Sequence, residues 1–340
     1  MKKNINILFF GLGSIGQRHL RNLKKLLKNN VNFYAYRKTK NVPLLNSHGN
    51  KTNGNIEEKF KISLISNLNF VESHNIDIVF ITNPSSLHLD TVLKLKKLRN
   101  AYIFIEKPID ASLKKNKIFL QHVKKNKLQV FVGYNMRFHS GYEKLKSILK
   151  KGNIFKEIYY VIFKCSENIK DHHSYEDYKV SYAAQKKLGG GVSLTNIHEI
   201  DMMLDLFGNA KILRSYKDKL SRFNLNVDDF SLSFYKNYFL GKKLVSLIIL
   251  DFIQSNKERY IKVVAKGGEI YLDLNKFTLK IINKNKNKNK VFNFVRNKNL
   301  MYMNELKFFL NYFQKKKRIP ANYNETNAFK SLELALKIKK

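Results

Sequence analysis

The chain has 340 residues, and its 64 lysines and arginines against 26 acidic residues give a formal net charge of +38. This length exceeds that of one typical domain, so two domains are expected. Because no run of 18 apolar residues occurs, we expect no membrane span. The single cysteine, Cys165, excludes an intrachain disulfide and fits a cytoplasmic location.

The net positive charge is the one feature of the sequence that favours a nucleic-acid partner, because nucleic acids are polyanions. Only 10 of the basic residues are arginines, whose planar fork is the usual choice for reading phosphates and bases. The lysines are spread along the whole length, so we expect no specific nucleic-acid partner. The Asn-Lys repeat at residues 283–290 lies between strand-like segments and predicts a solvated hairpin loop.

The chain opens with an apolar strand at residues 4–10, followed by a glycine-rich turn and a helix at residues 17–27. This order of strand, turn and helix is the context that a dinucleotide-binding fingerprint requires. The free N–H groups at the start of the helix would then face the pyrophosphate. The residues that we assign to this cofactor turn are Gly11, Gly13, Ser14, Ile15 and Gly16.

The second strand, at residues 32–36, ends in a basic rather than an acidic residue. An NAD-specific fold usually places an acid there for the ribose 2′-hydroxyl, whereas a basic group accommodates a 2′-phosphate. Arg37 occupies this place, and arginine is scarce in this chain. We therefore expect an NAD(P) cofactor, with NADP favoured.

Residues 41–60 are polar and predict a loop or irregular connection before a short segment at 62–65. A clear apolar strand follows at residues 76–82, and a helix is expected at 87–98. The turn between them holds proline and hydroxyl groups at the carboxyl end of a strand, which is the ligand-binding edge of a parallel sheet. Its candidate cofactor contacts are Thr82, Asn83, Pro84 and His88.

A further buried strand, at residues 102–105, ends abruptly in Glu106-Lys107-Pro108. Proline cannot continue the ladder, so Glu106 and Lys107 stand at the same ligand-binding edge. A helix at 113–125 and a strand at 129–133 follow. The alternation predicts a doubly wound, mostly parallel α/β Rossmann domain over residues 1–134.

Residues 135–340 predict an α+β domain. A helix at 142–150 precedes a strand at 157–165, and later strands follow one another without intervening helices, which is typical of an antiparallel sheet. Two helices are expected near the end of the chain, where they cap the fold. These later segments lie at residues 230–235, 243–252, 261–265, 269–273, 278–282, 301–313 and 328–339.

Three glycines at residues 189–191 lead into a helix that ends near Gly208. Thr195, His198 and Asp201 follow each other at intervals of three, which places neighbours on one face of a helix. One reading is a histidine satisfied by hydrogen bonds at a domain interface. A metal site is a weaker alternative, because His172, His173, His198, Glu199 and Asp201 follow no recognised ligand spacing. We assign no metal.

Taken together, these motifs resemble the Gfo/Idh/MocA oxidoreductases, the glucose-fructose oxidoreductase and inositol dehydrogenase family. The resemblance covers nearly the whole chain. It rests on four segments in the order seen in that family: residues 11–19, 82–88, 106–108 and 189–201. It implies a Rossmann domain, and a C-terminal domain whose large, mostly antiparallel, open-faced sheet carries substrate contacts or an oligomer interface.

The resemblance also implies roles for individual residues. Lys107 matches the family lysine that hydrogen-bonds the reacting hydroxyl and the nicotinamide ribose, and Glu106 belongs to the same cofactor-binding motif. His198 matches the family histidine that exchanges the proton. Many members have an aspartate where this chain has Thr195, and a threonine can orient a substrate hydroxyl but cannot hold the negative charge of an Asp-His pair. Arg137, Thr195, His198 and Asp201 are the expected substrate contacts.

The expected function is hydride transfer between NAD(P) and a sugar, nucleotide-sugar or polyol carbon. Relatives sharing the form of residues 189–201 are associated with surface-polysaccharide sugar metabolism. The expected protein is a cytoplasmic homodimer or homotetramer that takes a small sugar-type substrate. The alternative is a non-catalytic NAD(P)-binding sensor or regulatory protein, which Thr195 keeps open.

Overall fold

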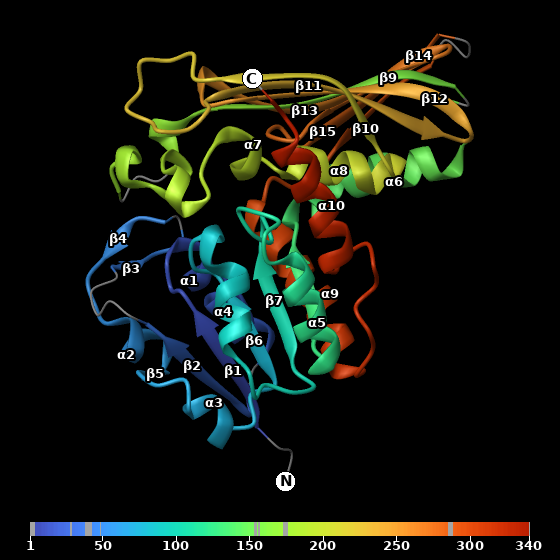
Figure 1. Ribbon diagram of the computed structural model, residues 1–340. Coiled ribbons are helices and arrows are strands. Elements are labelled where there is room, and N and C mark those ends of the chain that lie inside the picture. The colour runs from blue at the N-terminus through green and yellow to red at the C-terminus, as the bar shows by residue number, and fades with distance from the viewer. Residues whose placement is uncertain are drawn as a thin grey trace.

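The computed structural model describes residues 4–27, 29–37, 43–47, 49–152, 155, 157–172, 176–284 and 288–339. These residues form a six-stranded sheet, an eight-stranded sheet and one short two-stranded hairpin. Figure 1 shows the six-stranded sheet in the lower, blue-to-green half of the molecule and the larger sheet spread across the top. The two-part architecture predicted from the sequence is confirmed.

The strands of the N-terminal sheet are β1 (Ile5–Phe10), β2 (Val31–Tyr36), β5 (Ile62–Ile65), β6 (Ile78–Ile81), β7 (Tyr102–Glu106) and β8 (Gln129–Gly133). Their order is β5-β2-β1-β6-β7-β8, and every neighbouring pair is parallel. From β1 the chain adds β2 and β5 on one side and then β6, β7 and β8 on the other, so the order of strand addition reverses between β1 and β6. In an open parallel sheet this switch point creates the crevice in which ligands bind.

The helices of this half are α1 (Ser14–Leu26), α2 (Ile56–Phe60), α3 (Phe70–Ser73), α4 (His88–Lys94) and α5 (Asn116–Lys125). With helices on both faces, the central strands are buried throughout, which explains their unbroken apolar runs. One face carries a row of stacked rings across four adjacent strands. Phe80 lies 4.8 Å from Phe9 and 4.9 Å from Phe104, and Phe104 lies 5.2 Å from Phe131, measured between ring centroids.

Residues 43–60 hold more structure than the predicted loop, so that expectation is corrected. They form the hairpin of β3 (Leu44–Leu45) and β4 (Lys51–Thr52), and then α2. The side chain of Asn55 accepts a hydrogen bond from the Glu57 amide and caps this helix. Residues 41, 42 and 48 lie outside the described chain.

The strands of the C-terminal sheet are β9 (Ile158–Asn168), β10 (Lys211–Asp218), β11 (Phe230–Phe239), β12 (Lys242–Asp251), β13 (Ile253–Ala265), β14 (Gly268–Asp273), β15 (Thr278–Asn283) and β16 (Lys288–Asn293). Their order is β10-β11-β12-β9-β13-β14-β15-β16. All pairs are antiparallel except β12 with β9. β9 comes first in the chain and is inserted between the later strands β12 and β13.

The helices α6 (Ser140–Lys151), α7 (Val192–Thr195) and α8 (His198–Phe207) lie beneath this sheet in Figure 1. Side chains along β11 alternate between buried and half-buried, as a sheet with one covered face requires. The predicted hairpin at residues 283–290 joins β15 to β16. Lys288 to Lys290 already belong to β16, and residues 285–287 lie outside the described chain.

Two helices close the chain, α9 (Lys298–Gln314) and α10 (Glu325–Leu336). α9 returns to the N-terminal sheet, where Phe309 packs edge-on against Phe104 with 5.5 Å between ring centroids. The boundary at residue 134 stays a prediction, but α9 contributes to the core of the first domain. None of the described helices combines the length and apolar character needed to cross a membrane.

Candidate active site

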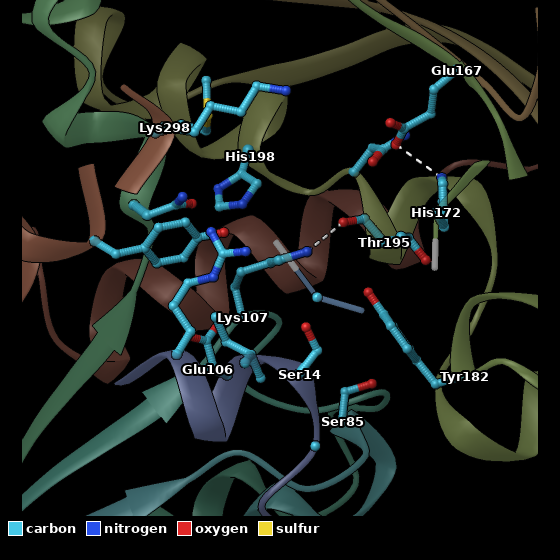
Figure 2. Close-up of a pocket in the computed structure, with 18 of the residues that line it drawn as sticks. Ser14, Ser85, Glu106, Lys107, Glu167, His172, Tyr182, Thr195, His198 and Lys298 are labelled. Carbon is cyan, nitrogen blue, oxygen red and sulfur yellow. Dashed lines mark hydrogen bonds and ion pairs between the residues drawn. The ribbon is translucent and has the colours of Figure 1, made fainter. Parts of the chain in front are cut away.

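A cavity of about 800 Å³ lies between the two halves of the molecule. Its floor is the carboxyl edge of the parallel sheet, and its roof comes from the C-terminal domain. Figure 2 shows Ser14, Ser85 and Lys107 approaching this space from the N-terminal side, while Thr195, Tyr182 and His198 approach it from the other side. The topological switch point and the second domain thus enclose one site.

In the glycine turn after β1, the backbone of Gly11 lies close to that of Asn83, and the backbone of Gly16 lies close to the Gly11 carbonyl. Gly11 has φ +96°, and a Cβ there would lie 2.7 Å from the Asn83 amide nitrogen. A Cβ on Gly16 would lie 2.4 Å from the Gly11 carbonyl oxygen. A Cβ on Gly13 would meet no atom within 4 Å, and Gly13 lines the cavity. Gly13 therefore leaves the cavity side of the turn accessible.

Ser14 and Ile15 continue the cavity wall at the first turn of α1, whose N-cap is Gly13. No side chain caps this helix end, so its N–H groups are available to an external anion. A dinucleotide pyrophosphate fits this arrangement. The predicted cofactor turn is therefore consistent with the geometry.

The turn after β6 braces the glycine turn and the end of β7. The Thr82 hydroxyl donates to the Gly11 carbonyl at 2.6 Å. His88 is buried, with Nε2 2.8 Å from the Asn83 carbonyl oxygen and Nδ1 2.9 Å from that of Pro108. Burial lowers the pKa of His88, and the two carbonyl contacts oppose this lowering. Both residues line the cavity, but their polar atoms are engaged with the backbone, so they shape the site.

Glu106 ends β7 and lies with one carboxylate oxygen 2.6 Å from Nε2 of His19. His19 is fully buried on α1, one turn after the glycine turn. This contact ties the helix to the strand that carries Lys107. The pairing was not predicted from the sequence, although His19 falls on the buried side of α1, where an unpaired imidazole is rare.

Lys107 reaches across the cavity. Its ammonium group donates to the main-chain carbonyl of Thr195 at 2.6 Å, which links the first domain to the second (Figure 2). Burial lowers the pKa of Lys107, and nearby Glu106 opposes the effect. A cation is thus held beside the histidine-bearing segment.

His198 begins α8 and lies above Lys107 in Figure 2. It is 6% exposed, and its Nδ1 atom has no hydrogen-bond partner among the described residues. Burial lowers its pKa well below the ordinary value, and the charges of Lys107, Arg259 and Arg137 lower it further. A neutral imidazole in this place is able to accept a proton.

Thr195, His198 and Asp201 do not share one continuous helix face, which corrects the sequence-based expectation. α7 ends at Thr195, and Asn196 leaves the helical region with φ −99° and ψ 37° before α8 begins. This break turns both Thr195 and His198 toward the cavity. Asp201 lies behind them.

Arg137 and Asp201 do not line the cavity, so the predicted substrate contact finds no support in the geometry. The Arg137 guanidinium donates to both carboxylate oxygens of Asp201 at 2.7 Å, and each side chain is 1% exposed. Asp205, one helical turn after Asp201, lies 3.3 Å from the same guanidinium. This buried ion pair holds α8 against the segment that follows β8.

Arg37 follows β2 and is half-buried, outside the wall of this cavity. Burial lowers its pKa, and nearby Glu57 opposes the effect. Within the described part of the chain, no three His, Cys, Asp or Glu side chains are grouped so as to hold a metal ion. His173, one of the ligand types considered above, lies outside that part.

The sequence did not reveal the charged wall that the C-terminal domain contributes. Glu167 lies 3.0 Å from His172 and also pairs with Lys257. Arg259 forms two hydrogen bonds to Glu199, at 2.7 and 3.0 Å. Strands β9 and β13 are neighbours, and this pairing brings Glu167 close to Lys257 and Arg259. A lysine such as Lys257 does not indicate a functional site in so basic a sequence. The scarcity of arginine was the available clue for Arg259.

Comparisons with known proteins agree with this arrangement. Residues 5–134 match the family model described as "Oxidoreductase family, NAD-binding Rossmann fold", GFO_IDH_MocA. Myo-inositol 2-dehydrogenase of Thermotoga maritima is 27% identical over 43% of this chain and 41% of its own length. The chain thus spans about two-fifths of the length of the curated relatives that it matches.

Two solved structures share the whole fold. Levoglucosan dehydrogenase in complex with NADH has a TM-score of 0.79 at 14% identity, over 99% of this chain and 96% of that one. The WlbA dehydrogenase of Bordetella pertussis, in complex with NADH and UDP-GlcNAcA, has a TM-score of 0.73 at 14% identity, over 99% and 95%. At this identity the likeness shows the fold alone.

Proposed function

We propose that this chain, whose residues 5–134 match the family model of the Gfo/Idh/MocA oxidoreductases, catalyses NAD(P)-dependent hydride transfer at a hydroxyl or carbonyl carbon of a sugar, nucleotide sugar or polyol. One observation carries the proposal: Lys107 and His198 come from different domains and line the same cavity, above the open turn at Gly13. Nicotinamide, when bound, supplies the hydride acceptor or donor at its C4 atom.

The chain's own residues would then hold and deprotonate the substrate. The Lys107 ammonium, fixed by the Thr195 carbonyl, stabilises negative charge on the substrate oxygen as a hydroxyl becomes an alkoxide. The neutral His198 imidazole accepts the hydroxyl proton and returns it in the reverse direction. The α1 amino end and Gly13 would hold the cofactor pyrophosphate. Thr195 would contact the substrate, in place of the usual aspartate.

Arg37 at the end of β2 favours NADP over NAD, because a guanidinium suits a 2′-phosphate. WlbA, which shares the fold, was solved in complex with UDP-GlcNAcA, and we therefore include nucleotide sugars among the proposed substrates. A role in surface-polysaccharide metabolism stays a prediction from the sequence resemblance. The sensor alternative gains no supporting observation from the site.

We also propose a cytoplasmic homodimer or homotetramer that pairs through the open face of the C-terminal sheet. Leu232 and Phe234 of β11 stand opposite Ile249 and Leu247 of β12 and are only half-buried on that face. Apolar side chains grouped in this way favour a protein partner. Light scattering at micromolar concentration tests the assembly, and a monomer would contradict it.

The test of function begins with binding and then measures turnover. Titration with NADH and NADPH, followed by nicotinamide fluorescence, should show saturable binding, tighter for NADPH. Turnover on a panel of sugars, polyols and nucleotide sugars should then fall about 100-fold or more in Lys107→Met and in His198→Asn, with cofactor binding retained. Lys125→Met, exposed on α5, is the matched control. Binding without turnover would favour the sensor, and equal rates in all variants would refute the assigned roles.

A further inference from the structure

Arg18 and Lys298 are two cations that line the cavity without an ion pair or hydrogen bond among the described residues, in contrast to Lys107, which donates to the Thr195 carbonyl. Lys257 pairs with Glu167, and Arg259 pairs with Glu199. Arg18 and Lys298 therefore leave two positive charges uncompensated at one end of the site.

Arg18 and Lys298 are held close together by α9. The Arg18 guanidinium stacks over the ring of Tyr302, 4.7 Å from its centroid. Tyr302 lies four residues after Lys298 on the same helix, which places the two side chains on one helix face. The stack orients Arg18 toward α9, away from the glycine turn at the start of its own helix.

The charged groups around Lys298 are mostly cationic. Partial burial lowers the pKa of Lys298, and Lys257, Arg259 and Arg18 lower it as well, while Glu167 opposes them. Figure 2 shows Lys298 above His198, on the side of the imidazole away from Lys107. An anion placed there would lie beside the reacting group and relieve this repulsion.

We propose that Arg18 and Lys298 bind an anionic group of the substrate, either a carboxylate or a phosphate, so that the substrate is an acidic sugar derivative. This inference rests on the proposed function, because it places the anion on the molecule that reacts at His198. Guanidinium supplies a planar pair of donors for such oxygens, and ammonium supplies a point charge. A neutral polyol would leave both cations unmatched.

The experiment measures anion binding to the enzyme saturated with NADH, by calorimetry at constant ionic strength. The probes are glucose, glucuronate, glucose 6-phosphate and inorganic pyrophosphate. At least one anion should bind more tightly than glucose. Glucuronate separates a carboxylate site from the phosphate site that the other two anions report. Because charge-assisted hydrogen bonds contribute about 1.5 to 3 kcal/mol each, Arg18→Gln or Lys298→Gln should weaken that anion about 10- to 100-fold.

Matched controls remove the effect of general positive charge. Lys25→Gln on α1 and Lys307→Gln on α9 change exposed lysines of the same two helices and should alter anion affinity less than twofold. Arg18→Lys should restore part of the affinity that Arg18→Gln loses. NADH affinity, measured in every variant, should stay within twofold of the original.

Three results would overturn the inference. The first is that no anion binds more tightly than glucose, and the second is that the two glutamine variants bind anions as the controls do. The third is an equal loss of NADH affinity in Arg18→Gln, which would assign the arginine to the cofactor. Failure of NADH to bind the unaltered enzyme would instead refute the proposed function itself, so the two failures are distinguishable.

Discussion

His198 lies among cations and has no carboxylate within hydrogen-bonding distance, so its protonation differs from that of an Asp-His pair. Burial and the charges of Lys107 and Arg259 lower its pKa below 6.5. Under the proposed function His198 is the base in alcohol oxidation and must be neutral to accept the proton, and a group with a lowered pKa stays neutral until the solution is more acidic. The acid limb of kcat/KM against pH should therefore lie below pH 6.5. An acid limb at or above 6.5 that is abolished in His198→Asn would contradict this environment.

Glu305 is a second residue whose charge state the structure defines. It is fully buried on α9, its two carboxylate oxygens have no hydrogen-bond partner among the described residues, and burial raises its pKa well above the ordinary value. The native state therefore retains a proton that the unfolded chain releases above about pH 4.5. Stability contributed at this site should fall as pH rises from 5 to 8.

Glu305→Gln should remove that pH-dependent component, because the amide carries no charge in either state. The urea midpoint of the variant, relative to the original, should be higher at pH 8 than at pH 5. Glu58→Gln, exposed on α2, should show no such difference between the two pH values. A variant less stable than the original by the same amount at both values would indicate that the carboxyl is ionised.

At this scale the sequence predicted the residues that stand at strand ends and missed those that depend on pairing. Lys107 and Glu106 follow a buried strand, so the edge of the sheet where they meet a ligand can be read from the pattern. Arg18 and Lys298 lie at opposite ends of the chain, and one more lysine in so basic a sequence carries no signal. The Arg137–Asp201 ion pair could not be predicted, because the sequence does not show which side of α8 faces the segment after β8.

Among the elements, the glycine segment before α7 controls how closely the two domains approach. Gly189 has φ +88°, and a Cβ there would lie 2.3 Å from the Ser85 hydroxyl and 2.9 Å from the Ala111 Cβ. Ser85 in turn donates to the carbonyl of Leu188 at 3.2 Å. The contact fixes the C-terminal domain over the turn that follows β6.

Gly189→Ala should therefore combine backbone strain with a clash and cost about 2 to 4 kcal/mol. Gly241→Ala is the matched control, because its φ is +77° and no atom lies within 4 Å of the added Cβ. The control should cost only about 1 to 2 kcal/mol of strain. Denaturant midpoints compare the two, and the cofactor affinity should fall only in Gly189→Ala. Equal losses of stability would show that the domain contact is not tight.

The same segment shows what periodicity does not predict. An interval of three residues from Thr195 to Asp201 fits a continuous helix, but the chain breaks at Asn196, so that Thr195 and His198 face the cavity while Asp201 pairs with Arg137. A break of two residues between helices leaves almost no mark in hydrophobic spacing. The strands, by contrast, were predictable because burial on one or two faces fixes their pattern.

At the level of the whole molecule, the first domain is completed by α9, a helix from near the end of the chain. The alternation of strands and helices predicted the parallel sheet, and consecutive strands predicted the second sheet. Nothing in the local pattern indicates that α9, far along the chain, covers the aromatic face of the first sheet. Apolar helix faces specify burial but not the surface that they bury against.

Phe309 tests this dependence of the first domain on the end of the chain. Its ring is fully buried and lies 5.5 Å from the rings of both Phe104 and Phe131 and 6.0 Å from that of Phe80. Phe309→Ala removes these contacts and leaves a cavity, at a cost of about 3 to 5 kcal/mol. Phe309→Leu keeps most of the volume and should cost less than about 1.5 kcal/mol.

Hydrogen exchange locates the loss. In Phe309→Ala the amides of β6 and β7 should exchange faster, because these strands lie under the missing ring, while β11 and β12 of the other sheet should keep their protection. Cofactor affinity should fall with the stability of the first domain, since both the glycine turn and Lys107 depend on β1 and β7 for their positions. Faster exchange confined to α9 would show that the first domain is stable without its late helix, and that the chain's two ends are only loosely coupled.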